Sequence, residues 1–281
     1  MSADFLEAIV KKNLLSVRPV ILATALLALL SKTAWAEGEG LDQADAASSG
    51  LTILNNATNV TRWGLGAGVG VGQSPYKGYG TKVEPFPLVY FDDKWVHLLG
   101  TTLDLKVGTW HGVSVALRGK YSLGDGYKQS DAPVLNGMED RNGAFWYGPA
   151  LAWHTAFGTL SGNYLLGGNK GEKAALDYSK SFDVGDFSLT PHVGIEWLSG
   201  KYVNYYYGVR PSEARPGRPA YTGTATWRTS LGTRVDYNVT KHQRFVLDVG
   251  LSHLGSGITD SPLVGKRFIP DIRLGYIYQF K

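Results

Sequence analysis

The sequence predicts an all-β protein, a transmembrane antiparallel β-barrel of about 12 strands, or 10 if the pieces around Gly100 form no hairpin. Apolar and polar residues alternate over most of residues 62–280, and a period of two is typical of strands with two different faces. No run after residue 36 approaches 18 consecutive apolar residues, so no helical span is predicted. The predicted connections alternate between short and long, as expected for barrels with short periplasmic turns and long external loops.

The N-terminal residues 1–36 have the order of a secretory signal peptide. Basic residues precede an apolar run over residues 20–30, and an A-x-A site follows, so we expect cleavage after Ala36. The run of 11 residues is too short to span a membrane, which needs about 20. Residues 37–60 are small, acidic and polar without a period, which predicts a flexible periplasmic segment before a barrel over residues 61–281.

The first strand, within residues 62–73, alternates apolar residues with five glycines at even positions 64–72. This pattern predicts a lipid-facing side and an inner face without side chains. Glycine there would let the barrel bend or let another group pack close inside. The spacing does not fit the G-x-G-x-x-G of a nucleotide-binding loop.

The second predicted strand, residues 82–91, contains Pro85 and Pro87. Their missing N–H groups would point toward the same neighbouring strand, so we expect a weakly paired or bulged stretch. A tight turn at residues 92–93 then leads to short strands around Gly100 and to a strand ending at Tyr121.

The remaining strands follow from the same alternation. They are predicted at residues 144–156, 159–166, 172–182, 187–197, 223–238, 243–254 and 270–280, with long external loops at 122–143, 198–222 and 255–269. The last strand resembles the C-terminal assembly signal of bacterial outer-membrane barrels through Gly275, Tyr278 and Phe280, although Lys281 follows the final aromatic residue. We therefore expect a C-terminal aromatic strand to close the barrel and to be read by the barrel-assembly machinery.

Charged residues within the predicted strands lie opposite apolar faces. A lipid-facing Arg or Lys at the bilayer midplane costs about 2–4 kcal/mol, so these residues are expected to face the lumen. The candidate lumen-lining residues are Arg118, Lys120, Asp177, Glu196, Arg228, Arg234, Asp236, Asp248 and Arg273. A lattice of salt bridges that fills the interior and a conducting pore are both compatible with this pattern.

The predicted loop at residues 198–222 is rich in tyrosine and arginine. Such residues are typical of binding hot spots and also of contacts with the membrane interface and with glycolipids. The candidate interfacial or partner-binding residues are Tyr205, Tyr206, Tyr207, Arg210 and Arg215.

Several chemistries have no support in the sequence. Cysteine is absent, and no two of the six histidines stand four residues apart, so neither a catalytic, a cofactor nor a metal site is predicted. After residue 36 the chain has 24 Lys and Arg against 22 Asp and Glu, a net charge of +2. A nucleic-acid partner is not expected, because such binding needs a clustered basic face.

Three motifs in order resemble the MipA/OmpV outer-membrane family. They are Ser74–Tyr79 with Pro85-Phe86-Pro87 and Tyr90, Tyr205–Val209 with Glu213-Ala214-Arg215, and Thr259–Val264. The resemblance implies a barrel in the outer membrane of a Gram-negative bacterium, surrounded by outer-membrane lipids, with no catalytic residues to carry over. The best-known member of the family is a scaffold between a lytic transglycosylase and a bifunctional peptidoglycan synthase, and other members are associated with osmotic response, adhesion or solute uptake.

Two functions from different classes therefore remain open. The first is a non-enzymatic scaffold or structural barrel that touches enzymes of murein synthesis and hydrolysis on the periplasmic side. The second is a small channel or solute-uptake barrel.

Overall fold

The computed structural model describes residues 51–53 and 59–281. The predicted signal peptide and most of the predicted flexible segment lie outside the described residues. All described residues belong to one compact unit, residues 45–281. Within them, no helix is both long and apolar enough to cross a membrane.

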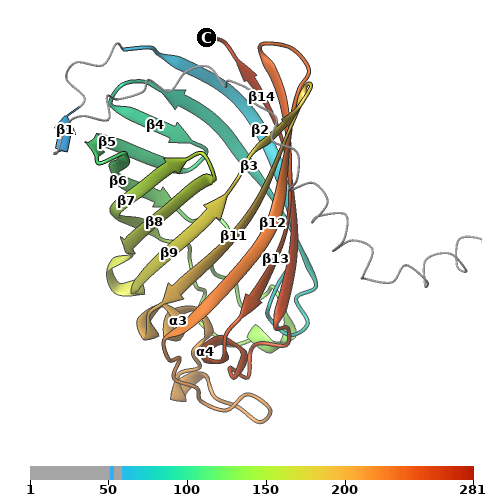
Figure 1. Ribbon diagram of the computed structural model, residues 1–281. Coiled ribbons are helices and arrows are strands. Elements are labelled where there is room, and N and C mark those ends of the chain that lie inside the picture. The colour runs from blue at the N-terminus through green and yellow to red at the C-terminus, as the bar shows by residue number, and fades with distance from the viewer. Residues whose placement is uncertain (1–50, 54–58) are drawn as a thin grey trace, which may run out of the picture. The chain divides into compact units, whose positions relative to one another are not determined.

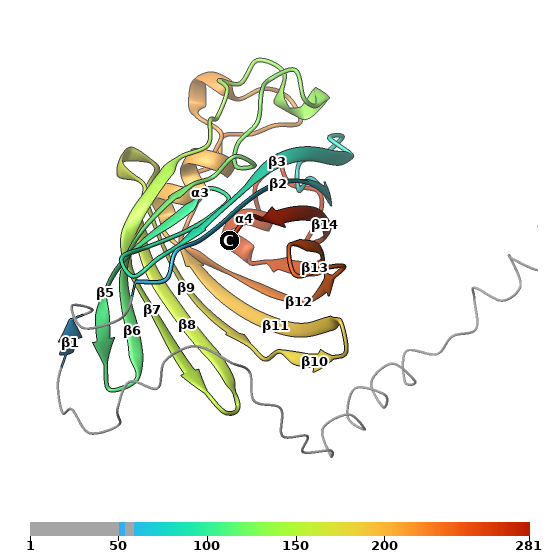
Figure 2. The ribbon, with the colours of Figure 1, turned by 90° about the horizontal axis from the view of Figure 1, so that it is seen from above.

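Twelve antiparallel strands pair in sequence order into a closed ring (Figures 1 and 2). They are β2 (Arg62–Gln73), β3 (Thr81–Asp92), β4 (Val96–Leu99), β5 (Thr102–Trp110), β6 (Val113–Tyr121), β7 (Phe145–Thr155), β8 (Gly158–Leu166), β9 (Glu172–Ser179), β11 (Phe187–Leu198), β12 (Thr226–Asn238), β13 (Gln243–Leu254) and β14 (Phe268–Gln279). The last strand, β14, pairs with the first ring strand, β2. The ring confirms the predicted barrel of 12 strands, the hairpin around Gly100 and closure by the C-terminal strand.

Two short strands pair with the ring without being part of it. β10 (Phe182–Val184) pairs with β11, and β1 (Leu51–Ile53) pairs with residues 108–110 of β5. β1 falls within the predicted flexible segment 37–60, most of which lies outside the described residues. β1 can pair here because β4 pairs only with residues 102–105 of β5, which leaves a strand edge that can take another strand.

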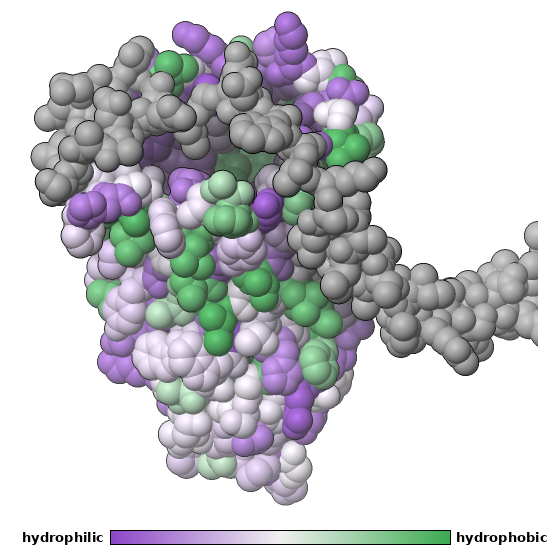
Figure 3. Space-filling model, in the orientation of Figure 1, coloured by the Kyte–Doolittle hydropathy of each residue, from purple (hydrophilic) through white to green (hydrophobic). Residues whose placement is uncertain are grey.

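The outer face of the barrel carries the apolar residues, as the alternation predicts. Exposed aromatic side chains gather at both ends of the strands, as in the girdles of membrane barrels. At one end they are Tyr121, Phe145, Tyr147, Tyr164, Trp227 and Phe268. At the other end they are Trp63, Trp110, Trp153, Phe157, Phe187, Tyr237, Phe245, Tyr278 and Phe280. Figure 3 shows apolar side chains between the two ends on one side of the wall.

The glycine-lined inner face of β2 is filled by a neighbouring strand. A Cβ at Gly68 would collide with the ring of Phe86, and a Cβ at Gly275 would lie 2.7 Å from Cδ1 of Leu88. The glycines therefore let β3 side chains lie flat against the wall, which is one of the two roles expected from the sequence.

Strand β3 is unevenly paired. It pairs with β2 along its whole length, but only residues 90–92 pair with β4 on its other side. This confirms the weak pairing expected around Pro85 and Pro87.

All the long connections lie at one end of the ring, which is the lower end in Figure 1. They contain η3 (Pro133–Leu135), α3 (Gly200–Tyr207), η5 (Pro211–Glu213) and α4 (Ser256–Thr259), while η4 (Gly168–Lys170) lies in the short connection between β8 and β9. Helix α3 begins after Ser199, whose side chain accepts a hydrogen bond from the N–H of Tyr202 at 3.3 Å. This hydrogen bond at the helix N-terminus satisfies one of the free N–H donors of the first helical turn.

Candidate functional site

The buried apolar core of the described chain lies at one end of the barrel. The connections 74–80, 122–144, 199–225 and 255–267, which we call the cap, supply most of this core. Its most deeply buried large side chains are Leu135, Met138, Trp146, Leu198, Val203, Tyr206, Ile258 and Leu263. The cap is therefore a packed structure at the barrel end.

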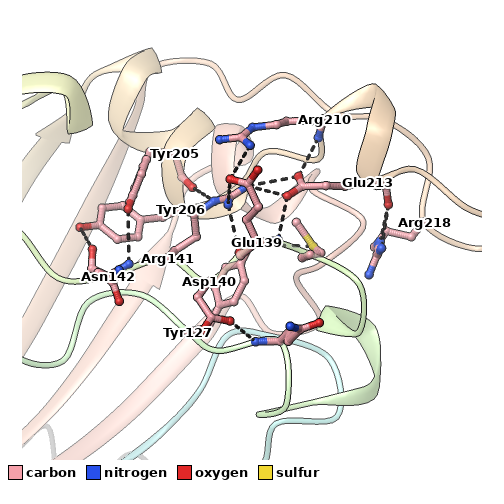
Figure 4. Close-up of polar contacts among 12 residues, drawn as sticks. Tyr127, Glu139, Asp140, Arg141, Asn142, Tyr205, Tyr206, Arg210, Glu213 and Arg218 are labelled. Carbon is pink, nitrogen blue, oxygen red and sulfur yellow. Dashed lines mark hydrogen bonds and ion pairs between the residues drawn. The ribbon is translucent and has the colours of Figure 1, made fainter.

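A buried ion pair ties the two longest connections of the cap together (Figure 4). Arg141 Nη2 donates to both carboxylate oxygens of Glu213, at 2.9 and 3.1 Å, and the two side chains are only 3% and 5% exposed. Arg141 Nε also donates to the carbonyl of Tyr205 at 2.9 Å. The Glu213 carboxylate accepts from the backbone N–H groups of Glu139 and Arg210 at 3.0 and 3.1 Å. Because both ions are hydrogen-bonded several times, the pair tolerates its burial.

Two further arginines bind η3 to the connection 199–225. Arg218 Nη1 donates to the carbonyls of Val134 and Asn136 at 2.6 and 2.9 Å, while its other nitrogens donate to the carbonyl of Glu213. Arg215 Nη2 donates to the carbonyl of Pro133 at 2.7 Å. These contacts hold the cap as one structure.

The structure corrects part of the prediction for the Tyr- and Arg-rich loop. Tyr206 and Tyr207 are buried, at 1% and 8% exposed, so their side chains contact neither lipid nor a partner. Their side chains pack in the cap because α3 turns them inward. Tyr76 also joins this helix to the cap, because its Oη donates to the backbone carbonyl of Tyr206 at 3.0 Å. Tyr205 is partly exposed, and Arg210 and Arg215 remain exposed.

The cap is predicted to loosen in acid. Burial by itself would raise the pKa of Glu213, but the N–H groups of Glu139 and Arg210 and the Arg141 guanidinium lower it below its ordinary value. The stabilisation from this carboxylate is thus present above its unfolded pKa of about 4.3 and lost as pH falls through the lower folded value. Limited proteolysis across pH 2–7 should show cap cleavage rising only at the acid end.

Glu213→Gln is the matched variant for this prediction. Because an amide does not titrate, its cap should be less stable at neutral pH and should show a weaker acid dependence. Equal acid dependence in the two proteins would contradict the assignment to Glu213.

The strand pairing places all nine predicted lumen residues on the face opposite the exposed apolar residues. Arg228 forms an ion pair with Glu196. Arg118 makes a bidentate contact with Asp104, at 2.8 Å for both bonds.

A second group of charges lies on β11, β12, β13 and β14. Asp248 Oδ2 is 3.2 Å from His192 Nε2 and 3.8 Å from Arg234 Nε. Arg273 Nη2 is 3.3 Å from Asp271 Oδ2. The lumen wall is therefore crosslinked by several ion pairs, which favours the salt-bridge lattice.

Three of the nine residues have no such partner among the described residues. Lys120, Asp177 and Asp236 form no ion pair within 4 Å in that part of the chain. Lys173 Nζ lies 4.0 Å from Glu196 Oε1. Sequence reasoning missed the partners Asp104, Lys173, His192 and Asp271. These partners occupy the same inner face, so the alternation that identified the nine residues could also have found them.

A chamber of about 280 Å³ lies between the cap and the inner wall. Cap residues, among them Tyr76, Tyr202, Tyr207 and Asp125, line it on one side. Strand residues line the other side, and the charged ones among them are Lys82, Glu84, Arg228, Asp271 and Arg273. Charges of both signs are present, so the lining favours neither anions nor cations. Among the described residues, no group of His, Cys, Asp or Glu could hold a metal ion.

A family model supports the sequence resemblance. The model for the MltA-interacting protein MipA matches residues 65–280, which is the barrel with its cap. The chain belongs to the MipA family.

Relatives agree with this membership. The MltA-interacting protein of Escherichia coli K12 is 30% identical over 229 residues, covering 78% of this chain and 90% of that protein. Outer membrane protein OmpV of Vibrio cholerae is 32% identical over 151 residues, covering 52% of this chain and 59% of that protein. Among solved structures, the COG4313 outer membrane channel of Pseudomonas putida F1 aligns with a TM-score of 0.39 at 13% identity, covering 86% of this chain and 100% of that protein. This member of the family is an outer-membrane β-barrel.

The residues of the predicted assembly signal lie at the closing seam. The ring of Phe280 stacks on that of Trp63 with centroids 4.3 Å apart, and the Phe280 N–H donates to the carbonyl of Trp63 at 2.9 Å. Tyr278 packs edge-on against Phe280, and Gly275 stands opposite Gly68 in the register of β14 with β2. These contacts join the last strand to the first.

Phe280→Ala is expected to lower the amount of folded protein in the outer membrane severalfold, because it removes the stacking on Trp63 and the last aromatic residue of the signal. The heat-modifiable fraction on gels of outer-membrane preparations measures this. Lys281→Ala is the control, since the Lys281 carbonyl accepts from the Trp63 N–H at 3.0 Å and this backbone bond is retained. Normal levels of the Phe280 variant would show that this residue is not part of an assembly signal.

Proposed function

We propose that this protein is a non-enzymatic structural barrel that holds a murein-processing enzyme, of the lytic transglycosylase class, at the periplasmic face of the outer membrane. The single observation that supports this best is the cap. A buried core with an internal ion pair lies at one end of the barrel, which disfavours a permanently open pore and favours a role at the other end.

The likeness to a relative supports the choice of partner. The relative named as interacting with MltA is aligned over 90% of its length. Its name speaks of a partner and of no reaction, which fits a scaffold. We carry this partner class over to the present chain as part of the proposal.

The end opposite the cap offers few places for a partner. It consists of short turns such as those at residues 111–112 and 185–186, together with β1. We propose that residues 37–60 and these turns form the contact, because an adaptable segment can order when it binds.

Capture of a purified lytic transglycosylase tests the proposal. Full-length protein in detergent should retain the enzyme, and deletion of residues 37–60 should weaken retention at least tenfold. A variant with residues 37–50 in scrambled order, which keeps β1, separates the role of sequence from that of length. Undiminished retention by the deletion would move the contact to the turns, and failure of every form to bind would overturn the proposal.

A channel is the alternative, and the charged chamber beneath the cap favours it. Planar-bilayer recording distinguishes the two functions. A scaffold with a closed end should stay silent. Discrete conductance steps whose ion selectivity changes in Arg228→Glu or Arg234→Glu would support the channel.

A further inference from the structure

The barrel wall has an opening beside β3. Residues 81–89 of β3 pair with β2 but have no strand on their other side, because β4 is short and reaches only residues 90–92 (Figure 1). Toward the cap, the start of the connection after β6 contacts this side of β3, where Lys82 Nζ donates to the carbonyl of Gly124 at 2.8 Å. A part of one strand is therefore missing from the wall.

Two prolines keep this edge from pairing. The Val89 carbonyl accepts from the Gly100 N–H at 2.9 Å on the β4 side, and alternate residues of a strand direct their polar groups to the same side. Pro85 and Pro87 thus occupy the positions whose N–H groups would point into the opening. Proline has no N–H to donate, so the edge leaves fewer unsatisfied donors and is a poor template for another strand.

A hollow of about 440 Å³ lies along the part of this edge nearest the cap. Thr81, Val83 and Pro85, which belong to the outer face, line it together with Lys82 and Glu84, which belong to the inner face. Lys82 and Glu84, together with Tyr79, also line the chamber beneath the cap. The Lys82–Glu84 ion pair, 2.7 Å long, stands at the boundary between the two spaces.

Apolar side chains lie beside the opening on both faces of the wall. Outside it, Val83 and Leu123 are 62% and 52% exposed. On the inner face, Phe86 and Leu88 of β3 extend over the glycines of β2 and β14, and the register of β4 puts Leu99 on the same inner face. This apolar patch interrupts a lumen that is otherwise lined by ion pairs.

We infer that the opening admits the acyl chain of a long-chain fatty acid from the outer leaflet, with its carboxylate at Lys82. The unpaired edge and the apolar side chains on both faces beside it suit a hydrocarbon chain. A peptide strand is disfavoured because Pro85 and Pro87 offer no donors, and a free polar solute would gain nothing from Phe86 and Leu88. The inference is independent of any murein enzyme as partner.

Fluorescence quenching tests this, and the absence of native cysteine makes single labelling simple. Leu99→Cys carries a fluorophore at the inner base of the opening. Leu103→Cys, on the lipid face, and Asn163→Cys, on the far inner wall, carry the same label as controls. The proteins are placed in phosphatidylcholine vesicles that contain brominated stearic acid.

The Leu99 label should be quenched saturably by brominated stearic acid, unbrominated stearic acid should compete, and the Asn163 label should remain bright. Brominated phosphatidylcholine should quench the Leu103 label but not the Leu99 label. Adding Leu88→Ser should raise the half-saturating concentration at least tenfold, whereas Leu103→Ser should leave it unchanged.

Two outcomes would overturn the inference. One is Leu99 quenching no stronger than that at Asn163. The other is quenching of the Leu99 label by brominated phosphatidylcholine as strong as that by brominated stearic acid, which would show that the opening admits any lipid chain. A heat-modifiable band for each variant confirms that the barrel compared is folded.

Discussion

Arg141→Met is expected to destabilise the cap by about 3–5 kcal/mol, because it leaves the Glu213 carboxylate buried without its counter-ion. The carboxylate is 5% exposed and cannot reach water without opening the cap. Hydrogen exchange of the amides in connections 122–144 and 199–225 measures the free energy of this opening. The barrel amides should keep their protection, since the pair lies outside the strands.

The double variant Arg141→Met, Glu213→Leu tests whether the loss comes from the unpaired charge. With both charges removed, no ion remains unpaired, so most of the lost protection should return. Arg210→Met is the matched control: its ion pair with Glu139 is between side chains that are 51% and 65% exposed. Such exposed pairs contribute about 0–1 kcal/mol. Wild-type protection in the Arg141 single variant would show that this pair does not hold the cap.

Leu231→Arg is expected to destabilise the barrel by about 2–4 kcal/mol, because it places a charge on the lipid face near the bilayer midplane. Leu231 is 60% exposed and lies halfway along β12 between Trp227 and Tyr237, which belong to opposite aromatic girdles. Denaturant unfolding in lipid vesicles, followed by tryptophan fluorescence, measures the loss.

Ser230→Arg is the matched control on the inner face. Its cross-strand neighbours Gly194 and Ser252 are small, so an arginine has room and can reach lumen water. The cost should be well below that of Leu231→Arg. Because a slip of one residue exchanges the two faces, equal costs would contradict the strand register.

The strands could be predicted closely from the sequence because every strand residue of a barrel faces either lipid or lumen. The alternation over residues 187–197 identified β11 to within one residue at its end. Pro85 and Pro87 likewise predicted weak pairing of β3, since the missing donors are a local property of the chain.

The sequence identified which residues face the lumen, but not which of them contact one another. Alternation assigned Glu196 and Arg228 to the lumen, but their direct pairing depends on the register between β11 and β12. His192 received no role from the sequence, and its position beside Asp248 follows from the packing of three strands.

The sequence by itself determined the barrel, its closure by the last strand and the side to which each strand residue points, because these follow from a period of two within short segments. Tertiary structure alone decided that the long connections form a packed cap and that Tyr206 and Tyr207 lie in its core. It also decided that β1 joins β5 and that β3 has an open edge. The physical reason is distance along the chain: the Tyr76–Tyr206 bond joins residues 130 apart and the Arg141–Glu213 pair residues 72 apart, and no local pattern specifies such contacts.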